Sequence, residues 1–280
     1  MIKLKEMSFG YGRENLFEHL SLDLEPGIFG LLGRNGAGKS SLLRILAGLL
    51  KTGSGECRIL GKDPFDRQPS FLKDVMLLSE EFYLPAVTGR EYVRLYAPFY
   101  PGFDRELFAK GVRELELDLD KKLTRLSYGQ KKKFLIAFCL ASGTRLLLLD
   151  EPTNGLDIPS KAQFRRLVAS SWSSERCIII STHQVRDVEE LIDPIIIVEG
   201  GRILFKYSIE EINRGLRFSV STRETTGEQV LYSEKGLGGW AVLEEGADEP
   251  GGAVDLELLF NGVLREPERI SRILTEVNRG

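Results

Sequence analysis

Three glycines, a lysine and two serines lie within residues 33–41, directly after the apolar run 28–32. The segment fits the pattern G-x-x-x-x-G-K-[ST]. Glycines let successive backbone N–H groups turn inward, and a helix that begins at the loop adds its positive N-terminal end. Lys39 can reach outer phosphates, and the Ser40 hydroxyl is placed to ligate Mg²⁺. The sequence predicts a phosphate-binding loop of Gly33, Arg34, Asn35, Gly36, Ala37, Gly38, Lys39, Ser40 and Ser41.

An acidic pair follows a second apolar run, where residues 146–149 end in Asp150 and Glu151. A buried strand of this kind would emerge beside the phosphate site. Asp150 would help to hold Mg²⁺, directly or through water. Glu151 would orient and polarise an attacking water molecule. The alternative is an acidic cap after a core strand.

Strand and helix patterns alternate along most of the chain. We expect a strand at 28–32, a helix at 39–49 and strands at the apolar runs near residues 57, 75, 146 and 177. A further helix is expected near 161–171, and a hairpin at Gly200-Gly201. Helical periodicity broken by prolines predicts a helical insert at about 85–142. This alternation indicates an α/β fold with a mostly parallel sheet covered on both faces.

The pattern changes after about residue 206. Short strand candidates are separated by glycine-rich turns, and two helix candidates follow, the second with Pro267 placed to begin it. We therefore expect a small C-terminal α+β region at 206–280. The strand candidates are 217–222, 228–234 and 240–245, and the helix candidates are 254–264 and 266–277.

The composition excludes several classes of protein. A hydrophobic content of 42% with 28% charged residues is typical of a globular chain. No apolar run reaches the roughly 18 residues of a membrane helix, and the N-terminus does not resemble a secretory signal. A formal charge of −3 argues against a dedicated nucleic-acid binder. The cysteines are expected to be core side chains rather than disulfides or metal ligands, and they are Cys57, Cys139 and Cys177.

A third motif, "LSYGQKKK" at residues 126–133, lies between the loop and the acidic pair. It resembles the LSGGQ signature of ABC-type ATPases. The order of loop, helical insert, signature, acidic pair, "NGLD" and "STH" is also similar to that family. The resemblance covers about residues 1–205 and implies a P-loop NTPase core with an antiparallel β-subdomain. It places a helical subdomain at about 85–142.

The resemblance implies roles for further residues. Tyr11 matches the aromatic residue that stacks on adenine, although it could be an ordinary strand tyrosine. Asp157 matches the loop that crosses a dimer interface. His183 matches the switch histidine at the γ-phosphate, and a core histidine is the alternative. Catalysis would then depend on Glu151, His183 and Lys39. The signature residues that contact the partner subunit's ATP would be Ser127, Gly129 and Gln130.

Two positions depart from the family pattern. Tyr128 stands where the signature has its first glycine, and we expect altered affinity rather than loss. Glu80 stands where a glutamine senses Mg²⁺ and water. A carboxylate there can still take a metal, but it adds negative charge near ATP. The run Lys131–Lys133 begins a helix with an apolar opposite face, so we expect a solvated basic edge; the alternative is a patch that binds phosphate or nucleic acid.

The resemblance also implies a mechanism. Two subunits would form a head-to-tail homodimer or heterodimer with two ATP molecules between them, and Mg²⁺ as cofactor. The chain would be the ATPase subunit of a bacterial multidrug- or antibiotic-type exporter. It would be cytoplasmic, peripheral on the inner face of the plasma membrane through a separate permease subunit. That partner would dock at residues 80–100, whose aromatic side chains could instead pack within the insert. The alternative function is a soluble ABC-type ATPase, for example in cluster assembly.

Overall fold

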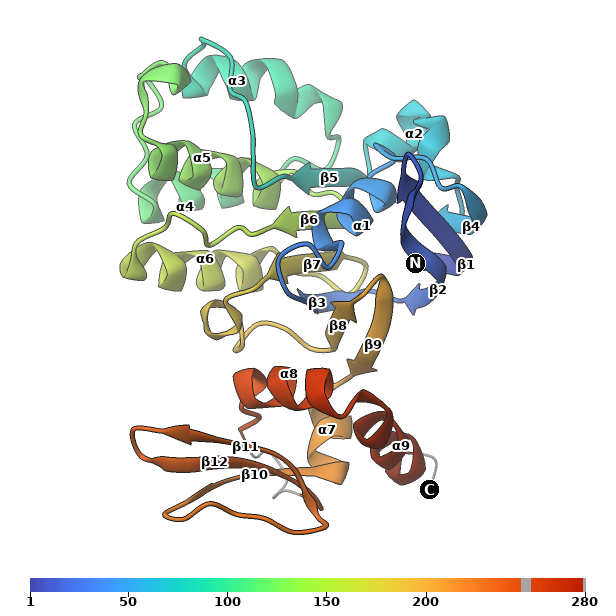
Figure 1. Ribbon diagram of the computed structural model, residues 1–280. Helices are drawn as coiled ribbons and strands as arrows, with labels where there is room; N and C mark the ends of the chain where they lie inside the picture. Colours follow the sequence, from blue (N-terminus) through green and yellow to red (C-terminus); the bar gives the residue numbers. More distant parts are fainter. Residues whose placement is uncertain (248–252, 279–280) are drawn as a thin grey trace.

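The computed structural model describes residues 1–247 and 253–278. Its centre is a six-stranded sheet in the order β5-β6-β7-β3-β8-β9 (Figure 1). Neighbouring strands run parallel except at the β8–β9 hairpin, so the mostly parallel sheet and the hairpin at Gly200-Gly201 are both confirmed. The strands are β3 (Gly27–Leu32), β5 (Val75–Leu78), β6 (Leu146–Asp150), β7 (Cys177–Thr182), β8 (Ile195–Glu199) and β9 (Arg202–Tyr207).

The two faces of this sheet belong to two separate hydrophobic cores. In β6, Leu147 and Leu149 pack into one core, and Leu146 and Leu148 pack into the other. This alternation is the period of a strand that is buried on both faces. The first face is covered by helices α5 and α6, and the second by α1 together with an antiparallel sheet (Figure 1). The helices are α1 (Lys39–Leu46), α5 (Tyr128–Ala141) and α6 (Ile158–Ser171).

The antiparallel sheet has the order β2-β1-β4 and confirms the β-subdomain implied by the resemblance. Its apolar side chains, including Phe17, Met7 and Ile59, are buried against α1 in the second core. Cys57 lies in β4, and all three cysteines of the chain are buried and unpaired, as predicted. The strands are β1 (Ile2–Tyr11), β2 (Glu14–Leu24) and β4 (Ser54–Ile59).

Helix α1 ends three residues before the predicted end at residue 49. The cause is Gly48, which adopts a left-handed backbone conformation with φ of +71°. A Cβ atom at this position would lie 2.1 Å from the carbonyl oxygen of Pro64. A glycine in this conformation is a common end of helices, and here it turns the chain toward β4.

The predicted helical insert contains α3, α4 and α5, joined by short helical turns. Part of its aromatic content packs internally, since Tyr92 contacts both Phe134 and Phe138 edge to face. Within the described residues, no helix combines the length and the hydropathy needed to cross a bilayer. The remaining elements are α2 (Pro69–Leu72), α3 (Gly89–Tyr96), α4 (Arg105–Glu114) and the 3₁₀ turns η1 (Pro64–Asp66), η2 (Ala97–Phe99), η3 (Leu123–Arg125) and η4 (Val185–Asp187).

The C-terminal part forms a small α+β unit at the bottom of Figure 1. Its sheet has the order β10-β12-β11, and the predicted strands and helices are present. Helix α7 was not predicted, although Ser208 and Glu211 form the capping box that begins it. The unit contacts the rest of the chain through an ion pair between Arg186 and Glu257. The division into domains near residue 205 stays a prediction. The elements are α7 (Ile209–Gly215), β10 (Leu216–Ser221), β11 (Val230–Gly236), β12 (Gly239–Glu245), α8 (Leu256–Arg265) and α9 (Pro267–Val277).

Candidate functional site

The glycine-rich loop connects the end of β3 to the start of α1, as predicted. Gly38 has a φ of +102°, a backbone conformation that residues other than glycine rarely adopt. At Gly33 the reason for glycine is proximity, because a Cβ atom would lie 2.5 Å from the carbonyl oxygen of Val198. Within the part of the chain that the structure describes, no side chain caps α1. The first N–H groups of this helix therefore face the loop without an intrahelical partner.

Lys39 folds back over the loop that precedes it. Its ammonium group donates hydrogen bonds to the carbonyl oxygens of Gly33 at 2.7 Å and Arg34 at 3.2 Å. Nζ also lies 3.8 Å from Oε1 of Glu151, and the lysine is only 6% exposed. Burial lowers the pKa of Lys39, and the charge of Glu151 opposes part of this shift. The loop thus holds a largely desolvated cation at its centre.

A cavity of about 470 Å³ lies in front of the loop. The predicted residues Tyr11, Glu80 and Glu151 line it together with most of the loop, and Leu16 is a lining residue that the sequence did not indicate. The Tyr11 hydroxyl lies 3.0 Å from Oγ of Ser41, and its side chain is half exposed at the mouth. The lining residues are Tyr11, Leu16, Arg34, Asn35, Gly36, Gly38, Lys39, Ser40, Ser41, Glu80 and Glu151.

The acidic pair lies at the carboxyl end of β6, beside the end of β7. Ser181 of β7 donates a hydrogen bond to Oδ1 of Asp150 at 2.5 Å, and the Glu151 N–H donates to the Ser181 carbonyl at 3.0 Å. Glu151 itself is in the left-handed region, with a φ of +45°. Its Oε1 lies 2.9 Å from Nδ1 of His183, and among the described residues its buried Oε2 has no hydrogen-bond partner. Parallel strands thus bring together Lys39, Glu151 and His183 from three distant segments.

The oxygen donors near this cavity suit Mg²⁺, which prefers carboxylate, hydroxyl and water oxygens. Asp150 is 2% exposed, and the Ser40 and Glu80 side chains line the cavity. In residues 1–247 and 253–278, however, no cluster of three or more histidine, cysteine or acidic side chains could hold a metal ion. The residues therefore fit an ion that also depends on phosphate oxygens and water for its ligands.

The signature segment forms the N-terminus of α5. The Ser127 hydroxyl accepts a hydrogen bond from the Gln130 N–H at 3.3 Å, and the Gln130 side chain accepts one from the Ser127 N–H at 3.1 Å. These two bonds form a capping box. The lining of the loop cavity, all of it within the described chain, includes none of Ser127, Gly129 and Gln130. The structure of one subunit therefore does not join these predicted residues to the loop.

Tyr128, at the unusual signature position, packs within its own subunit. Its hydroxyl donates to the Glu80 carbonyl at 3.2 Å, and its ring stacks on Phe82 at 5.4 Å between centroids. The ring also covers Gly155, where a Cβ atom would lie 2.9 Å from it. The Glu80 carboxylate accepts a hydrogen bond from the Asn154 side chain at 3.1 Å. Tyr128 therefore joins the signature to the segment of Glu80, and the Glu80 carboxylate joins that segment to Asn154.

Asp157 caps α6 by accepting a hydrogen bond from the Ser160 N–H at 2.9 Å. Hydrogen bonding from Ser160 lowers the pKa of Asp157, and Lys133 lies 3.7 Å from its Oδ2. The carboxylate side chain is 64% exposed, so it remains accessible at the surface.

The prediction of a solvated basic edge is wrong for Lys132. This side chain is completely buried, and its ammonium group donates to the Glu151 carbonyl at 2.6 Å. The signal was present in the sequence, because Lys132 precedes the buried Leu135 and Ile136 by three and four residues. Helix residues at this spacing share one face. Lys132 is therefore a component of the site that the charged run did not indicate.

Comparisons with known proteins identify similar sequences and a similar fold. A family model described as ABC transporter matches residues 17–154. The bacitracin transport ATP-binding protein BcrA of Bacillus licheniformis is 33% identical over 76% of the chain and 72% of its own length. The SkfA peptide export ATP-binding protein SkfE of Bacillus subtilis is 32% identical over 73% and 87%. A solved ATP-binding subunit of an ABC transporter superposes with a TM-score of 0.69, at 25% identity, over 76% of this chain and 92% of that one.

Proposed function

Because the chain belongs to the ABC transporter family and is an ATP-binding, ATP-hydrolysing subunit of such a transporter, we propose that it drives export as a head-to-tail dimer. The observation that carries this proposal is the composition of the cavity. Among the described residues, its lining contains most of the glycine loop, Glu80 and Glu151, but no signature residue of the same chain. A second subunit, turned head to tail, would supply Ser127, Gly129 and Gln130 to the bound ATP. ATP would then favour the closed pair through its contacts with both subunits.

The contacts around Glu151 support its role as general base. His183 occupies the Oε1 side at 2.9 Å, which leaves Oε2, without a hydrogen-bond partner among the described residues, to accept a proton from water. The water oxygen would attack the γ-phosphorus atom as the bond to the bridging oxygen breaks, and ADP and phosphate would leave. Lys39 and the loop N–H groups would stabilise the charge on the transferred group. Asp150, Ser40 and Glu80 would hold Mg²⁺, which neutralises phosphate charge when bound.

The test is the substitution Glu151→Gln. It keeps the shape of the side chain and removes its basicity, so hydrolysis should fall by about 100-fold or more while ATP binding persists. With ATP and Mg²⁺ present, the variant should accumulate as a closed dimer in size-exclusion chromatography. The matched control is Glu175→Gln, which changes an exposed carboxylate just before the start of β7, whereas the site lies beside the end of that strand. Hydrolysis at the native rate by Glu151→Gln would refute the assignment.

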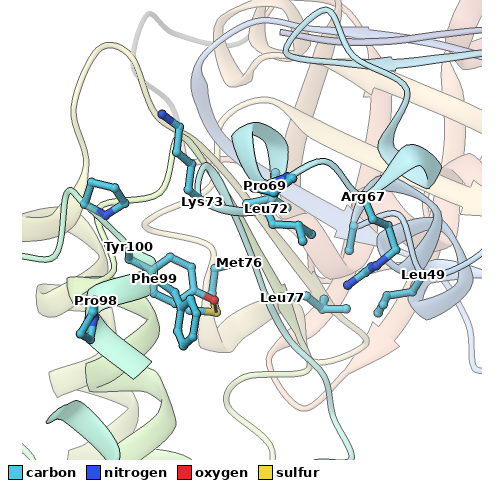
Figure 2. Close-up of a pocket in the computed structure, with 13 residues that line it drawn as sticks. Leu49, Arg67, Pro69, Leu72, Lys73, Met76, Leu77, Pro98, Phe99 and Tyr100 are labelled. Carbon is cyan, nitrogen blue, oxygen red and sulfur yellow. Dashed lines mark hydrogen bonds between the residues drawn. The ribbon is translucent and has the colours of Figure 1, made fainter. Parts of the chain in front are cut away.

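We also propose that a membrane-spanning permease subunit docks in a groove of about 710 Å³ between the sheet and the helical insert. Figure 2 shows Pro98, Phe99 and Tyr100 on one side of this groove, across from Leu49 and Arg67. Phe99 is 68% exposed, whereas the Tyr100 hydroxyl donates to the Met76 sulfur at 3.6 Å. An exposed aromatic ring at the rim of an apolar groove is suited to a short apolar segment of a partner.

The substitution Phe99→Ala tests this docking site. It should reduce co-purification of the permease by about tenfold, because buried aromatic anchors contribute strongly to interfaces. ATP binding by the isolated subunit should not change. Trp172→Ala, at the end of α6, removes another exposed aromatic side chain far along the sequence and serves as control. Undiminished co-purification of Phe99→Ala would contradict the proposed site.

This arrangement would hold the subunit on the inner face of the plasma membrane through its permease. The printed names of the similar proteins refer to transport of bacitracin and export of a peptide. The alternative of a soluble ATPase without a transport role is therefore not favoured. An exporter of this type would contact its cargo in the membrane subunit, so the cargo is not encoded in the residues of the ATP site.

A further inference from the structure

Lys132 is a buried cation that the proposed mechanism does not use. Its side chain has no exposed surface, and the residue lies in the second turn of the signature helix α5. Within the described residues, its ammonium group has a single hydrogen-bond acceptor, the carbonyl oxygen of Glu151 at 2.6 Å. No described carboxylate forms an ion pair with it. A buried charge that lacks a paired charge destabilises a fold by several kcal/mol, so stability alone does not explain this lysine.

The acceptor of this hydrogen bond is the backbone of a residue in a strained conformation. Glu151 has a φ of +45°, a backbone conformation that is unfavourable for residues other than glycine. The peptide group before it is held by β7, through the bond from the Glu151 N–H to the Ser181 carbonyl at 3.0 Å. The peptide group after it is held by Lys132 and, more weakly, by the Asn154 N–H at 3.3 Å. Of these two hydrogen bonds to the Glu151 carbonyl oxygen, the one from Lys132 is therefore the shorter.

The surroundings of the ammonium group are built from residues of the signature region. The Tyr128 ring lies over Nζ at 5.9 Å from its centroid, within the range of a cation–π contact. The same ring is fixed by its hydroxyl bond to the Glu80 carbonyl and by stacking on Phe82. Burial lowers the pKa of Lys132, and the charges of Glu80, Glu151 and Asp150 oppose this shift.

We propose that Lys132 is a positioning residue for Glu151. Its hydrogen bond holds the peptide group after Glu151, so that the carboxylate stays beside Lys39 and His183. This inference rests on the proposed role of Glu151 as general base. It adds a direct link between the signature helix, which would serve the partner subunit's ATP, and the carboxylate that serves the chain's own ATP.

The expected consequence of losing this link is misplacement rather than unfolding. With only the Asn154 N–H at its carbonyl, the Glu151 peptide group can rotate and move the carboxylate away from the attacking water. A displacement of about 1 Å at a reacting group can reduce the rate by about 100-fold. The glycine loop does not contact Lys132 in any hydrogen bond within the described chain, so ATP binding should not depend on it.

The experiment compares the wild-type chain with the variant Lys132→Met, each full length and assembled with the permease partner, in ATPase assays and thermal unfolding. Methionine matches the length of lysine and removes the charge and the donor groups. We expect kcat to fall by about 10- to 100-fold, with KM for ATP within about threefold of wild type. Tm should be unchanged or higher, because a desolvated charge is removed. A purely structural role predicts a lower Tm instead. Lys132→Gln keeps a neutral donor and should give a kcat between those of wild type and Lys132→Met.

The control for the charged run is Lys131→Met, the adjacent and partly exposed lysine, which should keep its kcat. A double-mutant cycle then distinguishes the positioning role of Lys132 from the role of Glu151 as general base. In single-turnover assays, adding Lys132→Met to Glu151→Gln should cause no further loss, since residues that act as one unit are not additive. A native kcat in Lys132→Met, or an equal further loss in the double variant, would overturn the inference alone. A native rate in Glu151→Gln would overturn the proposed function, and the inference with it.

Discussion

Two helices of this chain begin at predicted phosphate-binding segments, and they begin in different ways. Helix α1 follows Gly38, and among the described residues no side chain caps it. Helix α5 follows Ser127, and the reciprocal hydrogen bonds between Ser127 and Gln130 close its first turn. The N-terminus of α1 is thus free for an anion, whereas that of α5 is satisfied by its own side chains.

We expect this difference between the two helix N-termini to divide ATP binding from ATP hydrolysis. The glycine loop carries a buried lysine, so its half of the site is formed before ATP arrives. In the proposed dimer, the signature would exchange the Ser127–Gln130 hydrogen bond, which is already long at 3.3 Å, for a contact with phosphate. We therefore expect changes in the α1 half to affect ATP binding by one subunit. Changes in the α5 half should affect dimer closure and hydrolysis instead.

Among changes that compare the two helix N-termini, the largest effect is expected for Lys39→Met. It removes the ammonium group that bonds to Gly33 and Arg34, and a hydrogen bond to a charged group contributes about 1.5–3 kcal/mol. ATP affinity of the isolated subunit should fall by about 10- to 100-fold, measured by equilibrium titration with a fluorescent ATP analogue. Lys110→Met, on α4 and bonded to Ser170, is the control. Unchanged affinity in Lys39→Met would contradict the view that the loop is a preformed half.

A smaller and different effect is expected for Ser127→Ala. Loss of a helix cap lowers the free energy of unfolding by about 0.5–2 kcal/mol. Turnover of the dimer should fall about tenfold, whereas ATP affinity of the isolated subunit should not change. Ser208→Ala is a matched control, since Ser208 forms the same capping box at α7. Its stability loss should be similar without loss of turnover. Equal losses of turnover in both variants would mean that Ser127 has only a structural role.

The fold was predictable to the extent that local residues determine it. The glycine pattern correctly placed the loop between β3 and α1, and alternating apolar runs predicted a mostly parallel sheet. The predicted helix extends beyond the end of α1 because the leucine spacing continues to residue 49, whereas the left-handed conformation of Gly48 ends the helix. The order of the strands depends on pairing between distant segments and was not predicted from the sequence.

At the candidate site, too, the sequence predicted what local motifs determine and not the contacts between distant segments. Motifs indicated Lys39, Glu151 and His183, and the structure brings these three side chains into contact. The partners that hold them were missed, because the roles of Ser181 and Lys132 depend on packing between β6, β7 and α5. Lys132 was misjudged since a run of three lysines suggests a solvated edge, while helical spacing places its middle member in the core.

The smallest effect is expected for Gly129→Ala, which tests whether the signature glycine is needed for the fold or for closure. The added Cβ would lie 3.1 Å from the Gly155 carbonyl, so that loop must shift slightly. Alanine also reduces the freedom of the unfolded chain, which offsets part of this cost, and the free energy of unfolding should change by less than about 1 kcal/mol. Turnover should fall only about threefold, because the crowding acts on the loop that leads to Asp157. Gly227→Ala is the control in steady-state ATPase assays and thermal unfolding, because a Cβ there would meet no atom of the described chain within 4 Å beyond its two sequence neighbours. A large loss of ATP affinity in the isolated Gly129→Ala subunit would mean that the two helix N-termini do not divide binding and turnover between them.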